Sequence, residues 1–504
     1  MENRKKLLTA GFLTLIAAGI GFAVRGGLLE IWSKQYGFTM TELGQITGGG
    51  LLGFGLVILI AGALIDFVGY KKLMIIALGC HLISAVMLFA ATPVFNASGK
   101  DAVYMLLYIS MFIFAIGNGI CEAVINPLTA AIYPEEKTHY LNILHAGWPA
   151  GLVIGGLIVF AKGMVSWEIL MATFLIPVVM YGFICLKEPF PKTAAEQGTI
   201  SYGGMFAKLI GPFFLILLVA HACVGYVELG TDSWINKITG KILSSAALGT
   251  TLFIYTSLLM TALRFFAGPI VHKISSLGLL LASAVIGATG LYLISIGESV
   301  PFMFFAATVY ALGKTFLWPT MLGVVGERYP QSATVGMALM GFAGMTSAGL
   351  LGGPGIGYKQ DYFASRYIQE NAAQTYERVK APNENKFLFF PAITGIDGAK
   401  AGMIADDGEK IGKEVEIVGD KINNEDFKGL KSQYDWWEAN KQYASEDKGP
   451  VEAAELYGSR MALRVTALVP ATMAVLYLIL ILCFKAPKEE GDVHIADSAP
   501  GTEL

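Results

Sequence analysis

Residues 102–132, AVYMLLYISMFIFAIGNGICEAVINPLTAAI, are the most informative stretch of this chain. As a helix the stretch is long enough to cross the hydrocarbon core of a bilayer, which is about 30 Å thick. Glu122 is its only formally charged side chain. A charge near the bilayer centre costs upward of about 2.5 kcal/mol, so such residues usually face a protein-lined cavity and take part in moving a solute or an ion. Glu122 is therefore the first candidate for a functional residue.

The composition extends this interpretation to the whole chain. Of the 504 residues 54% are apolar and only 15% are charged, which is too apolar for a soluble core. Long apolar runs alternate with short polar loops, and we expect an all-α membrane protein. The expected helices cover residues 7–31, 43–68, 72–92, 102–133, 139–161, 166–187, 206–235, 245–272, 276–297, 301–327, 333–357 and 461–485, which makes twelve transmembrane spans.

Basic residues of the short loops predict the orientation. They fall on one side, which the positive-inside rule makes cytoplasmic, so both termini are expected inside the cell. These residues are Arg4, Lys5, Lys6, Lys71, Lys72, Lys187, Lys192, Lys208, His272, Lys273, Arg328, Lys485 and Lys488. The five cysteines lie within or at the ends of expected helices and show no metal-binding or disulfide spacing. We expect a multi-pass protein of a bacterial inner membrane, with no metal and no nucleic-acid partner.

Two weak internal repeats predict a duplicated architecture. The motif Tyr133-Pro134-x-x-x-Thr138 returns as Tyr329-Pro330-x-x-x-Thr334, and the loop at 62–72 is answered by residues 268–273. Their order fits two pseudo-symmetric six-helix bundles in parallel. The expected parts are an N-terminal bundle (1–187), a cytoplasmic linker (188–205), helices seven to eleven (206–357), an insertion (358–459), and helix twelve with a cytoplasmic tail (460–504).

The insertion at 358–459 is far longer than an ordinary loop of about five residues. With both termini inside, it must lie outside the cytoplasm, between the eleventh and twelfth helices. Its charged, mixed composition is compatible with a small, partly helical unit or with a disordered loop.

A family resemblance enters at the loop after the second span. Gly62-x-x-x-Asp66-x-x-Gly69-x-Lys71-Lys72 resembles the cytoplasmic loop signature of the major facilitator superfamily. Gly69 allows a tight turn, and Asp66 can cap or pair with positive charge at a neighbouring helix end, a contact that could latch the inner face shut. The alternative is that both lysines only set the topology and that Asp66 is a local cap. The family often has a basic residue where this chain has Phe67.

A narrower resemblance points to the fucose, glucose and galactose proton symporters. The fourth and fifth helices of these symporters resemble Glu122-x-x-x-Asn126-Pro127, Tyr133-Pro134 and Leu141-Asn142-x-x-His145 with Trp148 in this chain. Their seventh helix resembles Tyr226-Val-Glu228 and Asp232-Ser233-Trp234. The resemblance implies uptake of a monosaccharide coupled to H⁺, with Na⁺ as the alternative ion and no other cofactor. Arg25 stands where the branch commonly has an acidic residue, and His145 and Trp148 replace its amides. Both departures put a sugar as substrate in doubt, since a cation near the cavity could instead select an anionic solute.

Counting the helical rise tests whether the candidates can meet. From the expected cytoplasmic ends, Glu122 lies about 16 Å deep, Trp148 about 14 Å and Trp318 about 15 Å, all near the midplane of a 30 Å core. Lys314 lies one turn outward from Trp318 and is expected in the same wall or just above it. Arg25, about 28 Å from Lys6, is expected in the outer part of the first helix.

Chemistry assigns expected roles to these residues. The indoles of Trp148 and Trp318 can cover the C–H face of a sugar, while Asn126, His145 and Lys314 can hydrogen-bond its hydroxyls. Glu122 is the proton-coupling candidate, because burial favours a neutral carboxyl group; the alternative is a structural carboxyl.

The remaining polar residues are expected nearer the membrane surfaces. Arg25 is an outer-vestibule or gate residue in substrate contact, or an arginine that snorkels to the outer interface. Glu228, Asp232 and Trp234 are expected to form an outer gate, with an interfacial tryptophan and solvated carboxylates as the alternative. His81 and His221 are expected to be packed or locally bonded, and Arg264 to lie near the inner end of its helix.

Three functions stay open at this point. A proton-coupled sugar transporter working by alternating access, active as a monomer in the lipid bilayer on a small-molecule substrate, is the first. An organic-anion carrier that uses Arg25 or Lys314 is the second, and a non-transporting sensor with the insertion as its ligand module is the third. No nucleophile-base pair, metal cluster or nucleotide fingerprint is legible, so an enzyme is not expected.

Overall fold

Apolar helices form nearly all of the computed structural model, which describes residues 3–36, 40–162, 164–193, 202–384, 386–424 and 427–484. Within those ranges, 11 helices are long and apolar enough to cross a membrane. The expected span at 43–68 corresponds to α2 (Met40–Val68). Its apolar part, Gly53–Val68, is shorter than the 11 helices just counted. The structure is therefore an all-helical membrane protein, and the count of twelve spans stays a prediction.

The first part of the chain holds α1 (Arg4–Tyr36), α2, α3 (Tyr70–Phe89), α4 (Ala91–Ile132), α5 (Lys137–His145), α6 (Gly147–Val159), α7 (Trp167–Ala172) and α8 (Leu175–Lys187). The second part holds α9 (Tyr202–Leu209), α10 (Pro212–Gly225), the π-turn η1 (Tyr226–Gly230), α11 (Ile235–Ile242), α12 (Ala246–Arg264), α13 (Ala267–Ile274), α14 (Ser276–Ile296), α15 (Val300–Lys314), α16 (Leu317–Arg328), η2 (Pro330–Ser332), α17 (Ala333–Ser347), the π-turn η3 (Ala348–Gly352), α18 (Gly353–Asn371), α23 (Ala444–Thr466) and α24 (Leu468–Cys483).

Between α18 and α23 the described part of the insertion is partly helical, with a non-helical stretch between Val379 and Gly398. It contains α19 (Ala373–Val379), α20 (Gly398–Ala405), α21 (Glu409–Val418), η4 (Gly419–Asn423), α22 (Lys428–Asn440) and η6 (Lys441–Tyr443). Its own apolar clusters and a buried pair between Arg378 and Asp447 hold these short helices together. Of the two sequence alternatives, the helical one is correct for these residues.

Two expected helix ends were wrong. The span expected to end at 357 continues through η3 into α18 as far as Asn371, and the span expected to start at 461 is preceded by α23 from Ala444. The physical reason is that α18 and α23 pack along each other. Each provides the other with a partner for its apolar face, so both helices continue beyond the apolar run that defines the membrane span.

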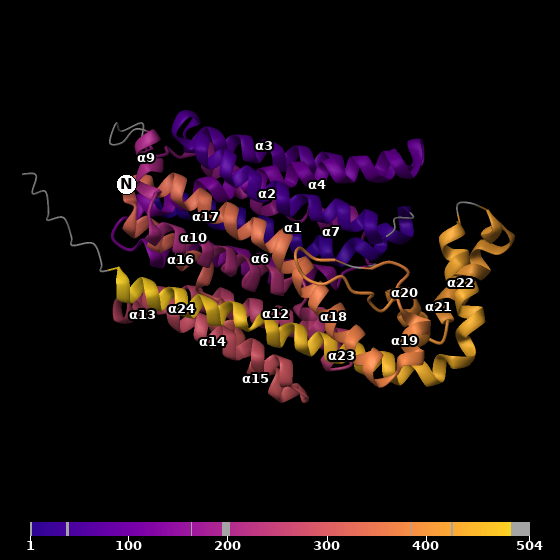
Figure 1. Ribbon diagram of the computed structural model, residues 1–504. Helices are drawn as coiled ribbons and strands as arrows, with labels where there is room; N and C mark the ends of the chain where they lie inside the picture. Colours follow the sequence, from indigo (N-terminus) through magenta and orange to yellow (C-terminus); the bar gives the residue numbers. More distant parts are fainter. Residues whose placement is uncertain are drawn as a thin grey trace, which may run out of the picture.

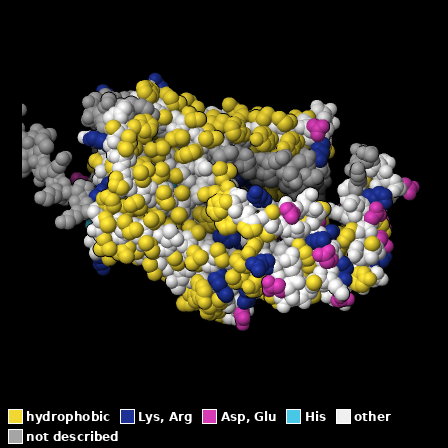
Figure 2. Space-filling model, viewed as in Figure 1, with side chains coloured by type: hydrophobic (Ala, Val, Ile, Leu, Met, Phe, Trp, Pro, Cys, Tyr) yellow, Lys and Arg dark blue, Asp and Glu magenta, His cyan; other side chains and the backbone are white. Residues whose placement is uncertain are grey.

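Figure 1 shows the two ends of the bundle clearly. The N-terminus and the end of α24 lie at one end, and α19–α22 lie beyond the opposite end. Hydrophobic side chains cover the flank of the bundle, whereas Lys, Arg, Asp and Glu gather over the insertion (Figure 2). This distribution is what a bundle with a lipid-facing flank and a water-facing insertion requires. The linker expected at 188–205 lies partly outside the described residues, and the tail after residue 484 wholly so.

The two parts of the chain face each other along their length. α2 packs on α17, α6 on α12, and α5 on α16. Near the N-terminal end of the bundle, Lys137 Nζ donates to Gly326 O at 2.9 Å, and Thr138 Oγ1 donates to Glu327 Oε1 at 2.5 Å. Ser276 Oγ donates to the same carboxylate oxygen at 2.9 Å. These bonds tie α5 to α14 and α16 and hold the two parts together at this end.

Glycine allows the closest helix contact within the first part. Where α1 crosses α6, a Cβ on Gly151 would lie 2.9 Å from Gly19 Cα and 3.0 Å from Ile20 N. Real Cβ atoms do not approach backbone so closely, so the two helices can pack at this distance only without that side chain.

We expect Gly151→Ala to lower the thermal unfolding midpoint of the purified protein, because overpacking a tight contact typically costs about 1–3 kcal/mol. Gly79→Ala in α3 is the matched control, since a Cβ there meets no atom within 4 Å. It should leave the midpoint unchanged or raise it, because alanine is the better helix former. Equal midpoints for both variants would contradict the packing argument.

Candidate functional site

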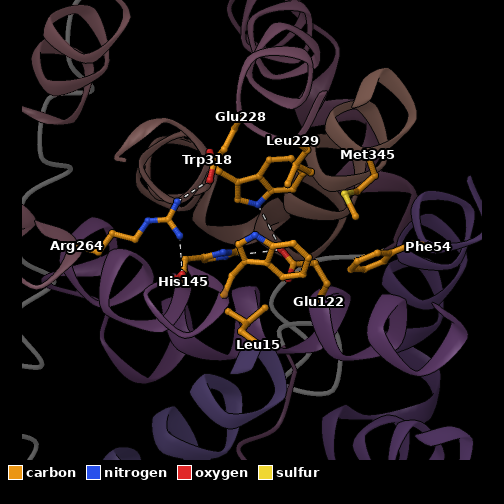
Figure 3. A pocket seen from close by; sticks show the side chains of 10 residues that line it. Leu15, Phe54, Glu122, His145, Glu228, Leu229, Arg264, Trp318 and Met345 are labelled. Atoms are coloured by element: carbon orange, nitrogen blue, oxygen red, sulfur yellow. Dashed lines mark hydrogen bonds and ion pairs between the residues drawn. The ribbon is translucent and has the colours of Figure 1, made fainter. Parts of the chain in front are cut away.

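A cavity lies in the middle of the bundle and is lined by residues from both parts of the chain (Figure 3). Its polar wall contains Glu122, Glu228, Arg264 and His145, and its indoles are Trp148 and Trp318. Leu15, Phe54, Leu229 and Met345 complete the lining. Glu122, Trp148 and Trp318 thus meet at one cavity, as the depth count predicted, and His145 joins them there.

Glu122 is the centre of a hydrogen-bond network in this cavity. Its side chain is buried, with 5% exposed, and its Oε1 accepts from Asn126 Nδ2 at 3.1 Å and from Trp318 Nε1 at 3.3 Å. His145 Nε2 donates to Asn126 Oδ1 at 2.8 Å and lies 3.7 Å from the same carboxylate oxygen. Asn126 therefore holds the carboxylate and the imidazole side by side. Because Trp318 belongs to α16, its bond to Glu122 joins the two parts of the chain.

Arg264 occupies the opposite side of the cavity, a position that the sequence interpretation missed. Its Nη2 donates to Glu228 Oε1 at 2.7 Å, its Nη1 to His145 O at 2.6 Å, and its Nε to Thr315 O at 2.8 Å. We expected this residue near the inner end of its helix. The signal was available, since eight residues from the expected end at 272 correspond to about 12 Å of depth.

Glu228 was expected at an outer gate, but its carboxylate lines the central cavity. It lies in the π-turn η1, which packs on the second π-turn, η3. At their contact a Cβ on Gly230 would lie 2.7 Å from Gly352 Cα. A π-turn widens a helix locally and rotates the residues that follow it, which a count at 1.5 Å per residue does not include.

Asp232 and Lys314 form a second buried pair. Lys314 Nζ donates to Asp232 Oδ1 at 2.5 Å, and the lysine side chain is fully buried. Neither residue is among the described residues that line the cavity. Of the two expected positions of Lys314, the one in the cavity wall is thus set aside and the one just above it stays, because an ammonium group in a low-dielectric interior lies against the nearest carboxylate. Trp234 Nε1 donates to Gly353 O at 2.8 Å, so this indole joins the segment just before α11 to the start of α18; a gating role for these residues stays a prediction.

Arg25 faces a second cavity. Phe22, Asn118, Phe114 and Trp148 lie around it, and Phe54 and Trp148 line both cavities. The guanidinium Cζ lies 5.5 Å from the centre of the Phe22 ring. With 9% exposed, the side chain is buried within the bundle, so the alternative in which it snorkels to the membrane surface is wrong.

The two other histidines are packed or locally bonded, as expected. His81 Nδ1 lies 2.9 Å from Tyr181 Oη, and its Nε2 lies 3.1 Å from Asn118 Oδ1. The ring of His221 packs on Trp318, with ring centres 4.5 Å apart.

The loop signature at 62–72 forms the turn between α2 and α3. Gly69 has a φ of 84°, a conformation that glycine adopts without strain. Lys71 Nζ donates to Leu186 O at 3.0 Å and Glu188 O at 3.1 Å, and so caps the C-terminal end of α8. Gly62 faces Ala338 of α17. Lys72 is exposed and Asp66 half-buried, and the latch role of the motif stays a prediction.

We expect Arg264→Met to lower the thermal unfolding midpoint strongly, because removing one partner of a buried pair leaves the other charge uncompensated, at a cost of about 3–5 kcal/mol. The double variant Arg264→Met with Glu228→Gln should recover part of this loss, since no charge is then stranded. Thermal unfolding of the detergent-purified variants measures both effects. A double variant no more stable than Arg264→Met would show that the pair is not the source of the loss.

Comparisons with known proteins show which family this chain is similar to. The family model described as Major Facilitator Superfamily matches residues 11–353. The L-fucose-proton symporter of Escherichia coli (strain K12) is 27% identical over 149 residues, which cover 29% of this chain and 32% of that protein, so the match spans about a third of this relative.

Solved structures share the fold. The transporter FucP in its outward conformation has a TM-score of 0.59 at 18% identity, covering 71% of this chain and 92% of FucP. The proton:xylose symporter XylE has a TM-score of 0.60 at 12% identity, with 73% and 91% covered. The family match covers more than half of the chain and confirms the resemblance seen in the loop signature: the chain belongs to the Major Facilitator Superfamily of membrane transporters.

Proposed function

We propose that this chain is a proton-coupled secondary active transporter that takes up a monosaccharide by alternating access between its two bundles. The observation that supports this most directly is the position of Glu122. Its buried carboxylate lies between the two parts of the chain, in one cavity with two indoles and an imidazole. A proton site and a polar and aromatic wall in the same cavity are what symport of a sugar requires.

The bonds of Glu122 offer a coupling mechanism. An ionised carboxylate accepts charge-assisted bonds from Asn126 Nδ2 and Trp318 Nε1. A proton on Glu122 removes the charge that strengthens these bonds, and the bond from Trp318 is the one that joins the two bundles. Proton binding therefore changes the relative stability of states in which the bundles are together or apart around the cavity.

The wall suits a monosaccharide. The faces of Trp148 and Trp318 can cover the C–H surface of a pyranose, while His145 and Asn126 supply directed polar groups for its hydroxyls. Two of the similar proteins are named as an L-fucose-proton symporter and a proton:xylose symporter. At their low identity these names support the proposal only by analogy.

The same proposal includes a placement in the membrane. With α2 counted beside the 11 longer apolar helices, the chain has twelve spans. Both termini are cytoplasmic. The insertion at 358–459 lies outside, consistent with its position at the opposite end of the bundle from the N-terminus (Figure 1). The two bundles comprise residues 1–187 and, beyond the linker 188–205, residues 206–357 together with helix twelve and the tail (460–504). The monomer is the working unit, in a bacterial inner membrane, with H⁺ as the coupling ion and Na⁺ as the alternative.

An organic-anion carrier is the second candidate, and one observation favours it. Arg25 faces the second cavity as a buried cation, next to Trp148.

We expect an inward proton gradient to drive hexose accumulation into proteoliposomes, by about tenfold per pH unit for one proton per sugar. Glu122→Gln should abolish this accumulation and keep sugar exchange, because glutamine retains the shape of the side chain but carries no proton. Uptake of a radiolabelled hexose panel, with and without the gradient, is the measurement. Glu298→Gln, at a carboxylate with 83% of its side chain exposed, is the control and should accumulate sugar normally. Undiminished accumulation by Glu122→Gln would rule out this residue as the coupling site.

We expect a cysteine introduced at Ile417, which is 85% exposed in α21, to react with a membrane-impermeant maleimide in intact cells. A cysteine in place of the exposed Lys72 should react only after the membrane is permeabilised. Both variants belong in a background without the five native cysteines. The reverse pattern would invert the proposed orientation.

A further inference from the structure

The buried cations of the bundle differ in one respect. Among the described residues, the buried Lys and Arg side chains are Arg25, Arg264 and Lys314. Arg264 lies 2.7 Å from the carboxylate of Glu228, and Lys314 lies 2.5 Å from that of Asp232. In the part of the chain that the structure describes, Arg25 has neither an ion pair nor a hydrogen bond. Among the described residues it is therefore the buried cation without a counter-charge.

An uncompensated guanidinium in this position is costly. Burying a charge without a partner is among the most unfavourable changes in a protein interior. The face of the Phe22 ring, 5.5 Å away, offsets only part of this cost, because a cation–π contact contributes modestly. A buried charge with an unfavourable free energy and no partner among the described residues is best explained by a ligand that binds and dissociates.

The lining of the second cavity fits an anion. The described residues around Arg25 include aromatic rings, alanines and Asn118, but no carboxylate. The carbonyl oxygen of Asn118 lies 3.1 Å from His81 Nε2, which leaves its amide N–H groups for a ligand. Arg25 adds the planar fork of donors that matches a carboxylate with two parallel bonds. Every polar group left free for a ligand in this cavity is thus a donor.

The two cavities are neighbours. Phe54 and Trp148 line both of them, so one ligand can contact the indole of Trp148 with its ring while an acidic group reaches Arg25. On this basis, and resting on the proposed sugar transport, we infer that Arg25 binds the carboxylate of the substrate and that the substrate is an acidic monosaccharide, such as a uronate or an aldonate.

The charge balance gives this inference an electrical signature. With Arg264–Glu228 and Lys314–Asp232 each neutral as a pair, one proton loaded onto the network of Glu122 and His145 leaves the charge of Arg25 uncompensated. A monoanion restores neutrality. Proton and sugar acid then cross together without net charge, whereas a proton with a neutral hexose carries one positive charge. A potential of 100 mV accumulates the second kind of cargo about 50-fold and leaves the first unaffected.

The test compares D-glucuronate and D-gluconate with D-glucose in proteoliposomes, with the pH gradient and the potassium-valinomycin potential set separately. The expected result is accumulation of an acid that follows the pH gradient and ignores the potential. Arg25→Met should weaken the apparent affinity for the acid about 10- to 100-fold, the usual effect of losing charge-assisted hydrogen bonds. Arg25→Lys should fall between, because it keeps the charge but loses the fork. Arg366→Met, at an exposed arginine of α18, is the control and should transport normally.

Thermal unfolding separates binding from folding in the same variants. Without ligand, Arg25→Met should be as stable as the natural protein or more so, because it removes a buried, unpaired charge. Glucuronate should raise the unfolding midpoint of the natural protein and of Arg366→Met, but not that of Arg25→Met; sodium chloride at equal ionic strength serves as the blank.

The failures are distinguishable. Potential-driven accumulation of glucose with no uptake of either acid, unchanged in Arg25→Met, would overturn the anion site and leave the sugar symporter standing. A folded protein that neither binds nor transports any of the three compounds would overturn the sugar symporter and the acidic substrate together. Uptake of the acid that is unaffected by Arg25→Met would retain the substrate class and remove Arg25 from it.

Discussion

An ionised side chain inside a membrane-embedded bundle needs a partner, and this requirement organises the interior of the protein. Arg264 pairs with Glu228 and Lys314 with Asp232, each across different helices of the second part of the chain. Breaking either pair would strand a charge where water cannot easily reach it. The pairs therefore fix how η1, α12 and α15 lie against one another. Two charged residues of the cavity wall, Glu228 and Arg264, lie on this fixed frame, whereas Glu122 of α4 and Arg25 of α1 belong to neither pair.

Breaks in the helices make these charges tolerable. His145 is the last residue of α5, Arg264 of α12 and Lys314 of α15, and Glu228 lies in a π-turn. At a helix C-terminus the last carbonyl groups have no partner within the helix and carry partial negative charge. Arg264 uses two of these, donating to His145 O at the end of α5 and to Thr315 O just after α15. The ends of α5 and α15 thus solvate one guanidinium in the centre of the bundle, a task that unbroken spans could not perform.

This also explains what the sequence could and could not reveal. The meeting of Glu122, Trp148 and Trp318 depends only on helical rise and on correct span limits, so counting residues was enough to predict it. The pairing of Lys314 with Asp232 depends on which face of α15 packs against η1, and on the π-turn that shifts the position of Asp232. Neither can be calculated from the depth of a residue along its helix. Gly313 and Pro319 flank the break at Thr315 and Phe316, and Pro319 has no N–H to bond Thr315 O, but neither residue tells which side chain the freed carbonyl will meet. Likewise, α18 runs past residue 357 because α23 packs against it, and a contact made across about a hundred residues is invisible to local periodicity.

Helix α5 links the chemistry of the cavity to the closed end of the bundle. At its start, Lys137 and Thr138 bond to Gly326 and Glu327 and hold the two parts together; at its end, His145 contacts the network of Glu122. The helix has nine residues and is about 14 Å long. A change in the bonding of His145 that tilts this helix must also strain the bond between Thr138 and Glu327. The proposed coupling therefore has a physical route: His145, which contacts the network of Glu122, and the groups that hold the two parts together at the N-terminal end of the bundle lie on the same helix.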